Sequence, residues 1–182
     1  MKAMIQKLQL SWMKKVNRMK KKIICFMAAL ALLVCGCSDG GASADAETVS
    51  MYDLSKAMLS ADDSLPDMTS VSSSDDDAEN LFGYLSDLEY DKVDSFFLSY
   101  SSEGLADEIA VIAVKDISDV SEAKDTLDAQ VKSRLNTYTQ YDPSQVERVE
   151  DAVVFTSGRY AVLIICDKSD AVKAAFNDFI SQ

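Results

Sequence analysis

The sequence predicts an α+β fold, in which a mainly antiparallel sheet of about four strands carries helices packed on one face. Strand-like apolar segments occur in two pairs, 93–100 with 108–114 and 152–156 with 160–166. Each pair is followed by a segment whose apolar residues recur at helical spacing. Two strand-strand-helix units that share one sheet account for this order.

The strands differ in how deeply they are expected to lie. In segment 108–114 (EIAVIAV) every residue after Glu108 is apolar, so side chains on both sides of the strand are apolar. The segment is therefore expected to be buried on both faces in the centre of the sheet. Segments 152–156 and 160–166 flank Ser157-Gly158, a two-residue signal for a hairpin turn.

Helices are predicted after each strand pair. The first runs from about 119 to 139 and the last begins at about 170. The stripe of the first helix comprises Val120, Ala123, Leu127, Val131, Leu135 and Tyr138. Between the first of these helices and the second strand pair, Asp142-Pro143-Ser144-Gln145 has the N-cap and first-turn residues of a short helix. A further helix is expected near 78–88, with Asp76 and Glu79 as a capping box.

The two strand-helix junctions resemble each other. Residues 109–119 align with residues 160–170, and five of the eleven positions are identical. Each copy reads strand, Asp-x-Ser-Asp, helix. Gene duplication explains the match, and so does convergence, because Ser and Asp are favoured residues at helix N-termini.

The charge of the chain is divided sharply along its length. Eight of the 18 Lys and Arg residues lie at or before Lys22, whereas the first acidic residue is Asp39. Residues 19–22 (MKKK) precede the apolar run 23–34, which has the length of a signal-peptide core and is short for a membrane span. Residues 1–36 are therefore predicted to be a secretory signal, which starts at Met1, Met13 or Met19.

Two cysteines close the apolar run. In Val34-Cys35-Gly36-Cys37 an aliphatic residue stands three positions before Cys37 and a small residue directly before it. This is the spacing of a bacterial lipobox, with cleavage between Gly36 and Cys37 and lipidation of Cys37. Cys35 fits less well because Val34 before it is bulky. The modified cysteine would anchor the protein in a membrane, since two or three acyl chains hold stably where one is marginal.

The predicted mature chain has three parts. Cys37 and a small, acidic tether reach to residue 51, and residues 52–182 form a single domain. Cys166 is the only other cysteine after the signal, so no intramolecular disulfide is expected. We interpret it as a small core residue at a strand end, because the chain has no His to activate a nucleophile.

Composition excludes several kinds of site. The absence of His removes the usual Ser-His-Asp arrangement and most zinc sites, and no glycine-rich phosphate loop occurs. From residue 37 onward, 30 acids stand against 10 bases, a balance that repels nucleic acid. We therefore expect no cofactor, no nucleic-acid partner and no enzymatic activity.

Three groups of side chains remain as candidates. Weak metal-ligand candidates would converge at one end of the sheet if the two units were symmetric, although helix capping explains them as well: Asp116, Asp119, Asp167 and Asp170. Arg134 on the long helix is expected to form an ion pair, with anion binding as the alternative. Tyr100, Tyr138, Tyr141 and Tyr160 suit the edge of a core better than an aromatic ligand surface.

Several segments resemble an uncharacterised bacterial lipoprotein family, domain-of-unknown-function family 4358, over most of residues 80–181. The resemblance is carried by Glu108 before the apolar strand, Arg134, the Tyr-Asp-Pro-x-Gln segment 141–145 and the Gly-x-Tyr segment 158–160. It implies a lipoprotein signal and no established activity, so it transfers no functional residue.

These observations lead to one functional expectation and one alternative. The chain is expected to be a membrane-anchored, extracytoplasmic lipoprotein that acts as a non-enzymatic interaction module and binds a protein of the cell envelope. The alternative is a lipoprotein that binds a cation or small ligand through the acidic residues at the strand ends.

Overall fold

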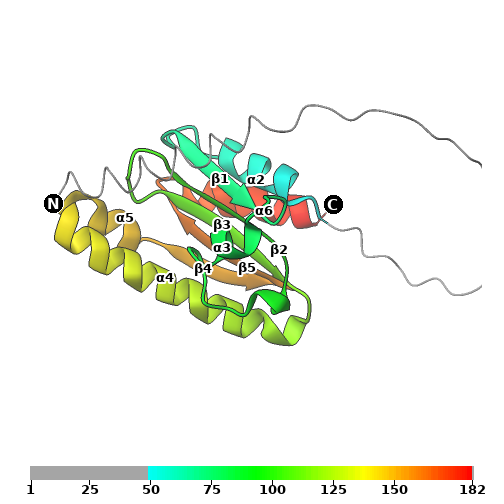
Figure 1. Cartoon of the computed structure of the whole chain (residues 1–182). Helices are drawn as coiled ribbons and strands as arrows, with labels where there is room; N and C mark the ends of the chain where they lie inside the picture. Colours follow the sequence, from blue (N-terminus) through cyan, green and yellow to red (C-terminus); the bar gives the residue numbers. More distant parts are fainter. Residues whose placement is uncertain (1–48, 182) are drawn as a thin grey trace, which may run out of the picture. The chain divides into compact units, whose positions relative to one another are not determined.

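The computed structural model describes residues 49–181 of the chain. Five strands form one antiparallel sheet in the order β1-β2-β3-β5-β4 (Figure 1). Their bounds are Met68–Ser72 for β1, Val93–Ser101 for β2, Glu108–Val114 for β3, Val153–Ser157 for β4 and Tyr160–Ile165 for β5. The α+β fold is confirmed, with β1 added at one edge of the expected sheet.

Five α-helices and three short 3₁₀ turns accompany the strands in the described part of the chain. The helices are α2 (Met51–Ser60), α3 (Ala78–Phe82), α4 (Val120–Tyr141), α5 (Val146–Glu150) and α6 (Ser169–Ile180). The turns are η1 (Tyr90–Lys92), η2 (Ile117–Asp119) and η3 (Pro143–Gln145). Helix α2 starts at Met51, one residue before the expected start of the domain, and Met51 is buried. None of the helices within residues 49–181 has the length and apolar character needed to cross a membrane.

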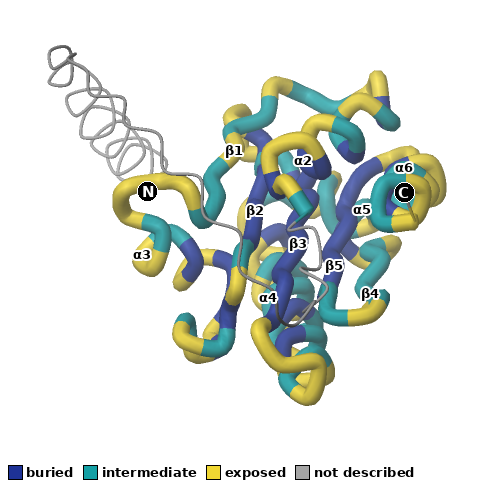
Figure 2. The backbone as a smooth tube through the Cα atoms, turned by 90° about the vertical axis from the view of Figure 1, so that its right-hand side faces the viewer, coloured by how far each residue is buried: buried dark blue, intermediate teal, exposed yellow. Residues whose placement is uncertain are grey.

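The helices cover both faces of the sheet, which corrects the expectation that they cover one. Helices α3, α4 and α5 pack on the face that carries Ala110 and Ile112. Helices α2 and α6 pack on the face that carries Ile109 and Val111, and they also contact each other. Figure 2 shows β3 and β5 buried along their lengths in the centre of the sheet. Because these strands are apolar on both sides, each side needs a covering layer.

The two strand-strand-helix units are not related by symmetry. Strands β3 and β5 are neighbours, and Val111 pairs with its counterpart Val162. A two-fold axis that relates two adjacent antiparallel strands leaves each face of the sheet on its own side, so α4 and α6 would share a face. They lie on opposite faces instead. The junctions are alike because both begin a helix after a buried strand.

The helix expected near residues 78–88 is shorter than predicted, because α3 spans only Ala78–Phe82. That helix ends at Phe82, before Gly83, and a glycine is unfavourable inside a helix. Asp77 is its N-cap residue, and the expected Asp76–Glu79 capping box does not form. In contrast, the Asp142 side chain accepts a hydrogen bond from the Ser144 N–H at 3.3 Å, as expected at the start of η3.

Candidate functional site

Two adjacent acidic residues are buried where β3 begins. Asp107 is 0 % exposed and Glu108 is 2 % exposed. A buried carboxylate requires a counter-charge or hydrogen bonds. We call the face of the sheet covered by α3, α4 and α5 the α4 face, and the one covered by α2 and α6 the α6 face. Each of the two acids pairs with an arginine from a helix on the α4 face. Arg148 of α5 pairs with Asp107, and Arg134 of α4 pairs with Glu108. We call these four residues the paired-acid cluster.

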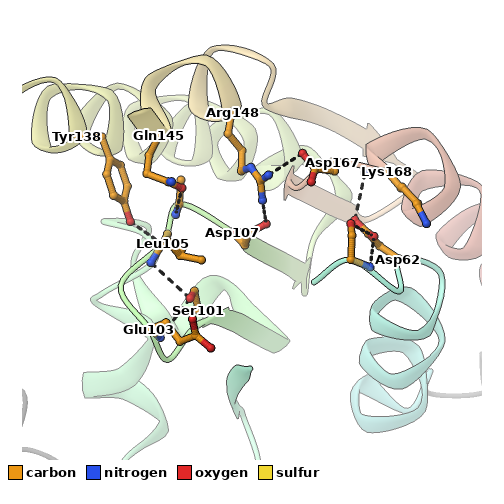
Figure 3. A network of polar contacts seen from close by, with 12 residues as sticks. Asp62, Ser101, Glu103, Leu105, Asp107, Tyr138, Gln145, Arg148, Asp167 and Lys168 are labelled. Atoms are coloured by element: carbon orange, nitrogen blue, oxygen red, sulfur yellow. Dashed lines mark hydrogen bonds and ion pairs between the residues drawn. The ribbon is translucent and has the colours of Figure 1, made fainter. Parts of the chain in front are cut away.

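Arg148 links two acids across the end of the sheet. Its Nη1 bonds Asp107 Oδ1, and its Nη2 lies 2.6 Å from Asp167 Oδ1, beyond the end of β5 (Figure 3). Burial disfavours the charge on the Arg148 guanidinium, but the two carboxylates outweigh burial and raise its pKa. Asp107 Oδ2 is buried and has no hydrogen-bond partner within residues 49–181. Arg148 thus fixes the start of β3 to the end of β5.

The second pair lies between β3 and α4. Arg134 Nη2 is 2.5 Å from Glu108 Oε2, and Gln130 Nε2 donates to Glu108 Oε1 at 3.3 Å. The ion pair expected for Arg134 is confirmed. The Arg134 guanidinium also lies 5.7 Å from the ring centroid of Tyr138, within range of a cation–π contact.

The loop before Asp107 is held by side chains from α4 and η3. The Tyr138 hydroxyl donates to the carbonyl of Leu105 at 2.6 Å, and Gln145 Oε1 accepts from the Ala106 N–H at 3.0 Å (Figure 3). Ser101 Oγ accepts from the Leu105 N–H at 3.4 Å. Buried polar groups of the loop are satisfied in this way, and the loop places both acids toward their arginines.

A third buried acid lies beside the two helices, α2 and α6, that cover the other face of the sheet. Asp62, which follows α2, accepts the Lys168 N–H at 3.0 Å and the Ser64 N–H at 2.9 Å. Burial raises the pKa of the Asp62 carboxyl, but hydrogen bonds from the Ser64 hydroxyl and from these two N–H groups outweigh burial and lower the pKa below its usual value. Asp62 therefore connects the end of α2 with the start of α6.

The four aspartates proposed as metal ligands do not converge. Strands β3 and β5 are antiparallel, so their carboxyl ends lie at opposite ends of the sheet. Asp116 and Asp119 follow β3, while Asp167 and Asp170 follow β5. In the described part of the chain, no three His, Cys, Asp or Glu residues are grouped to hold a metal ion.

Local contacts account for three of these aspartates. Asp116 Oδ1 accepts the Ser118 N–H at 2.9 Å, and this hydrogen bond, with one from the Ser118 hydroxyl, lowers the pKa of Asp116. Asp119 lies 3.9 Å from Lys92 Nζ, and Asp167 is bound by Arg148. Asp170 is exposed in the first turn of α6. The capping interpretation explains Asp116 directly.

The four tyrosines do not form one surface. Tyr100 and Tyr138 pack on the α4 face, Tyr160 packs on the α6 face, and Tyr141 is 60 % exposed at the end of α4.

Cys37 and the predicted cleavage site after Gly36 lie outside the described residues. Sequence reasoning missed Asp107, Arg148 and Asp62; the one local signal was an acid pair directly before a wholly apolar strand.

Cys166 is expected to be unreactive in the native protein. Burial, with a hydrogen bond to Asp62, raises the pKa of its thiol to about 12, and only the thiolate is nucleophilic. Iodoacetamide at neutral pH should alkylate the native residue about a thousandfold more slowly than an ordinary thiol. Mass spectrometry of the peptide that contains Cys166 measures this, with the urea-unfolded protein as the reactive control. Rapid alkylation of the native protein would contradict the buried position.

Glu108 is expected to make stability depend on pH. Burial raises the pKa of its carboxyl, and Arg134 and Gln130 only partly offset this. The folded state therefore keeps the proton at pH values where the unfolded chain has lost it. Stability from Glu108 is full below the unfolded pKa and is lost as pH rises through the folded pKa, by up to about 1.4 kcal/mol per pH unit.

Glu108→Gln removes this titration. The unfolding free energy of the variant minus that of the parent should grow as pH rises through this window, in denaturant titrations at a series of pH values. A difference that stays level, or that shrinks, would show that burial does not dominate at Glu108.

Comparison with known proteins identifies a family. The family model described as "Domain of unknown function (DUF4358)" matches residues 63–166. No curated protein and no solved structure matches the chain. The matched residues contain the whole sheet and the paired-acid cluster, whereas α2 and α6 lie outside them. The chain belongs to the DUF4358 family.

Proposed function

We propose that the protein is a lipid-anchored, extracytoplasmic component of a bacterial cell envelope, whose α+β domain is a non-enzymatic interaction module. The observation that carries the proposal is the order basic n-region, apolar run, Val34-Cys35-Gly36-Cys37. Cys37 would then become the acylated N-terminus of the mature chain.

The charges of the domain are consistent with a role away from the lipid surface. Anionic headgroups repel a chain that has 30 acids and 10 bases from residue 37 onward. The 13 residues between Cys37 and Met51 allow a separation of at most about 50 Å when extended. The domain would therefore meet partners within that distance of the membrane.

The paired-acid cluster supports a binding role over catalysis. Asp107 and Glu108 are each neutralised by an arginine, and Asp107 is fixed to Asp167 through Arg148. A general acid or base must reach a substrate proton, whereas these side chains hold a loop and two helices together. The alternative of cation binding by the four strand-end aspartates has lost its basis, because they lie at opposite ends of the sheet.

Cys37→Ala is expected to abolish acylation and processing. In cells fed an alkyne-tagged fatty acid, the parent should be labelled and should have the mass of residues 37–182 plus its lipid groups, while the variant should be unlabelled and retain residues 1–36. Cys35→Ala is the matched control and should behave as the parent. Label on the Cys37→Ala protein would contradict the assignment of the anchor.

Crosslinking in intact cells tests the interaction role. We expect one envelope protein to be captured at near-stoichiometric yield with the lipidated parent and to be lost with Cys37→Ala. Turnover of an envelope substrate that is lost on mutation of a surface acid would instead show an enzyme.

A further inference from the structure

The Arg134 guanidinium is only partly used by the contacts that hold it. An arginine has five N–H donors, and within residues 49–181 its only charged partner is Glu108, at Nη2. Nε is buried without a hydrogen-bond partner among these residues. The side chain as a whole is 25 % exposed and Nη1 has no ion-pair partner among these residues, so the terminal nitrogens, and not the buried Nε, are the donors that a molecule from solvent can reach.

Arg148 provides the internal comparison. Its side chain is 26 % exposed, almost the same as that of Arg134, and it too pairs with a fully buried acid. Both of its terminal nitrogens, however, are taken by carboxylates, Asp107 at Nη1 and Asp167 at Nη2. Arg148 is thus occupied by the fold itself, and Arg134 is not.

Arg134 is held in a fixed orientation. Glu108 fixes it from the sheet, and Tyr138, one turn further along α4, lies beside the guanidinium. Gln130, one turn earlier, donates to Glu108 and to the carbonyl of Tyr84 at 3.4 Å. A pre-organised donor loses little freedom when it binds, which favours affinity.

Two tyrosines lie near Glu108, the partner of this guanidinium, since Gln130 bonds both Glu108 and the Tyr84 carbonyl and Tyr100 pairs with Glu108. Tyr100 pairs with Glu108 in the register of β2 and β3 and packs on the α4 face. Burial raises the pKa of Tyr100, and the neighbouring Tyr84 raises it further, so its hydroxyl is protonated at neutral pH. Tyr84 is 65 % exposed and lies two residues after the end of α3. Guanidinium and phenol donors together suit a carboxylate.

The charge around the site restricts which anion can approach. Acids outnumber bases three to one from residue 37 onward, so a polyanion such as phosphate is repelled. A ligand that carries a positive group beside its carboxylate is attracted by the same field. We propose that Arg134, with Tyr84 and Tyr100, binds the carboxylate of a zwitterionic ligand, the class of free amino acids and short peptides. This inference does not depend on the lipid anchor.

Thermal unfolding of the purified protein with defined probes tests the inference. L-lysyl-L-alanine or L-lysine should raise Tm in a saturable way, and the stronger of the two distinguishes a peptide from a free amino acid. Acetate, which lacks the cation, and L-lysinamide, which lacks the carboxylate, should not raise Tm. Absence of a rise with either zwitterion, or an equal rise with inorganic phosphate, would overturn the proposal.

Variants assign the effect to Arg134. Glu108→Gln with Arg134→Gln removes both charges, and it should weaken the ligand midpoint about tenfold or more. The matched control, Asp107→Asn with Arg148→Gln, should keep the parent midpoint. Tyr84→Ala changes an exposed side chain, so it should fold as the parent does and still weaken binding. An unchanged midpoint in the Tyr84→Ala protein, or in a folded Arg134 double variant, would refute the site.

Discussion

Arg148→Ala is expected to destabilise the protein by about 3–5 kcal/mol, because it leaves a buried carboxylate without its counter-charge. Asp107 is 1 % exposed at its side chain and has Arg148 as its only ion-pair partner within residues 49–181. The variant also loses the link from α5 to Asp167. Urea unfolding followed by circular dichroism measures the loss.

The double variant Asp107→Asn with Arg148→Gln separates the lost charge from lost packing. It removes both charges at nearly constant volume, so it should recover most of the stability that Arg148→Ala loses. A double variant as unstable as Arg148→Ala would show that packing of the Arg148 side chain, and not the buried charge of Asp107, dominates.

Phe176→Ala should cost a similar amount, about 3–5 kcal/mol, through the cavity that it leaves. Phe176 is 0 % exposed on α6 and meets the rings of Phe155 and Tyr160 edge-on, with centroids 5.4 and 6.0 Å away. Its removal opens the layer in which α6 and α2 cover the second face of the sheet. The midpoint of urea unfolding reports the loss.

Tyr52→Ala is the control for Phe176→Ala. Tyr52 lies on α2 in the same layer, but it is 74 % exposed, so its truncation should change stability by less than about 0.5 kcal/mol. A small effect at Phe176 would mean that α6 contributes little to the core. That result would fit a domain limited to the family-matched residues 63–166, which we do not expect because Phe97 and Val162 would lose their cover.

The sequence predicted the parts of the fold that depend on local periodicity. Strands β2, β3 and β5 and helices α4 and α6 lie close to their expected bounds, because each has a strong apolar pattern. Strand β1 (MTSVS) is short and mostly polar, and it is a strand because β2 pairs with it. Helix α2 had a readable signal that was overlooked, since Met51, Leu54, Ser55 and Met58 are spaced to share one face and are all buried.

The candidate site depended on contacts between distant segments, which one sequence does not reveal. Arg134 was expected to pair with an acid, but its partner Glu108 lies 26 positions away. Asp62 meets the Lys168 backbone only because α2 and α6 pack together. The convergence of the four aspartates was wrong for a topological reason: the repeated Asp-x-Ser-Asp segments follow antiparallel neighbours, whose ends point apart.

The most direct test of the anchoring proposal is the mass of the N-terminal peptide of the protein purified from its native membrane. The proposal predicts a chain that begins at Cys37 and carries a diacylglyceryl group on the cysteine sulfur. A chain that retains residues 1–36, or one cleaved elsewhere with an unmodified Cys37, would contradict it.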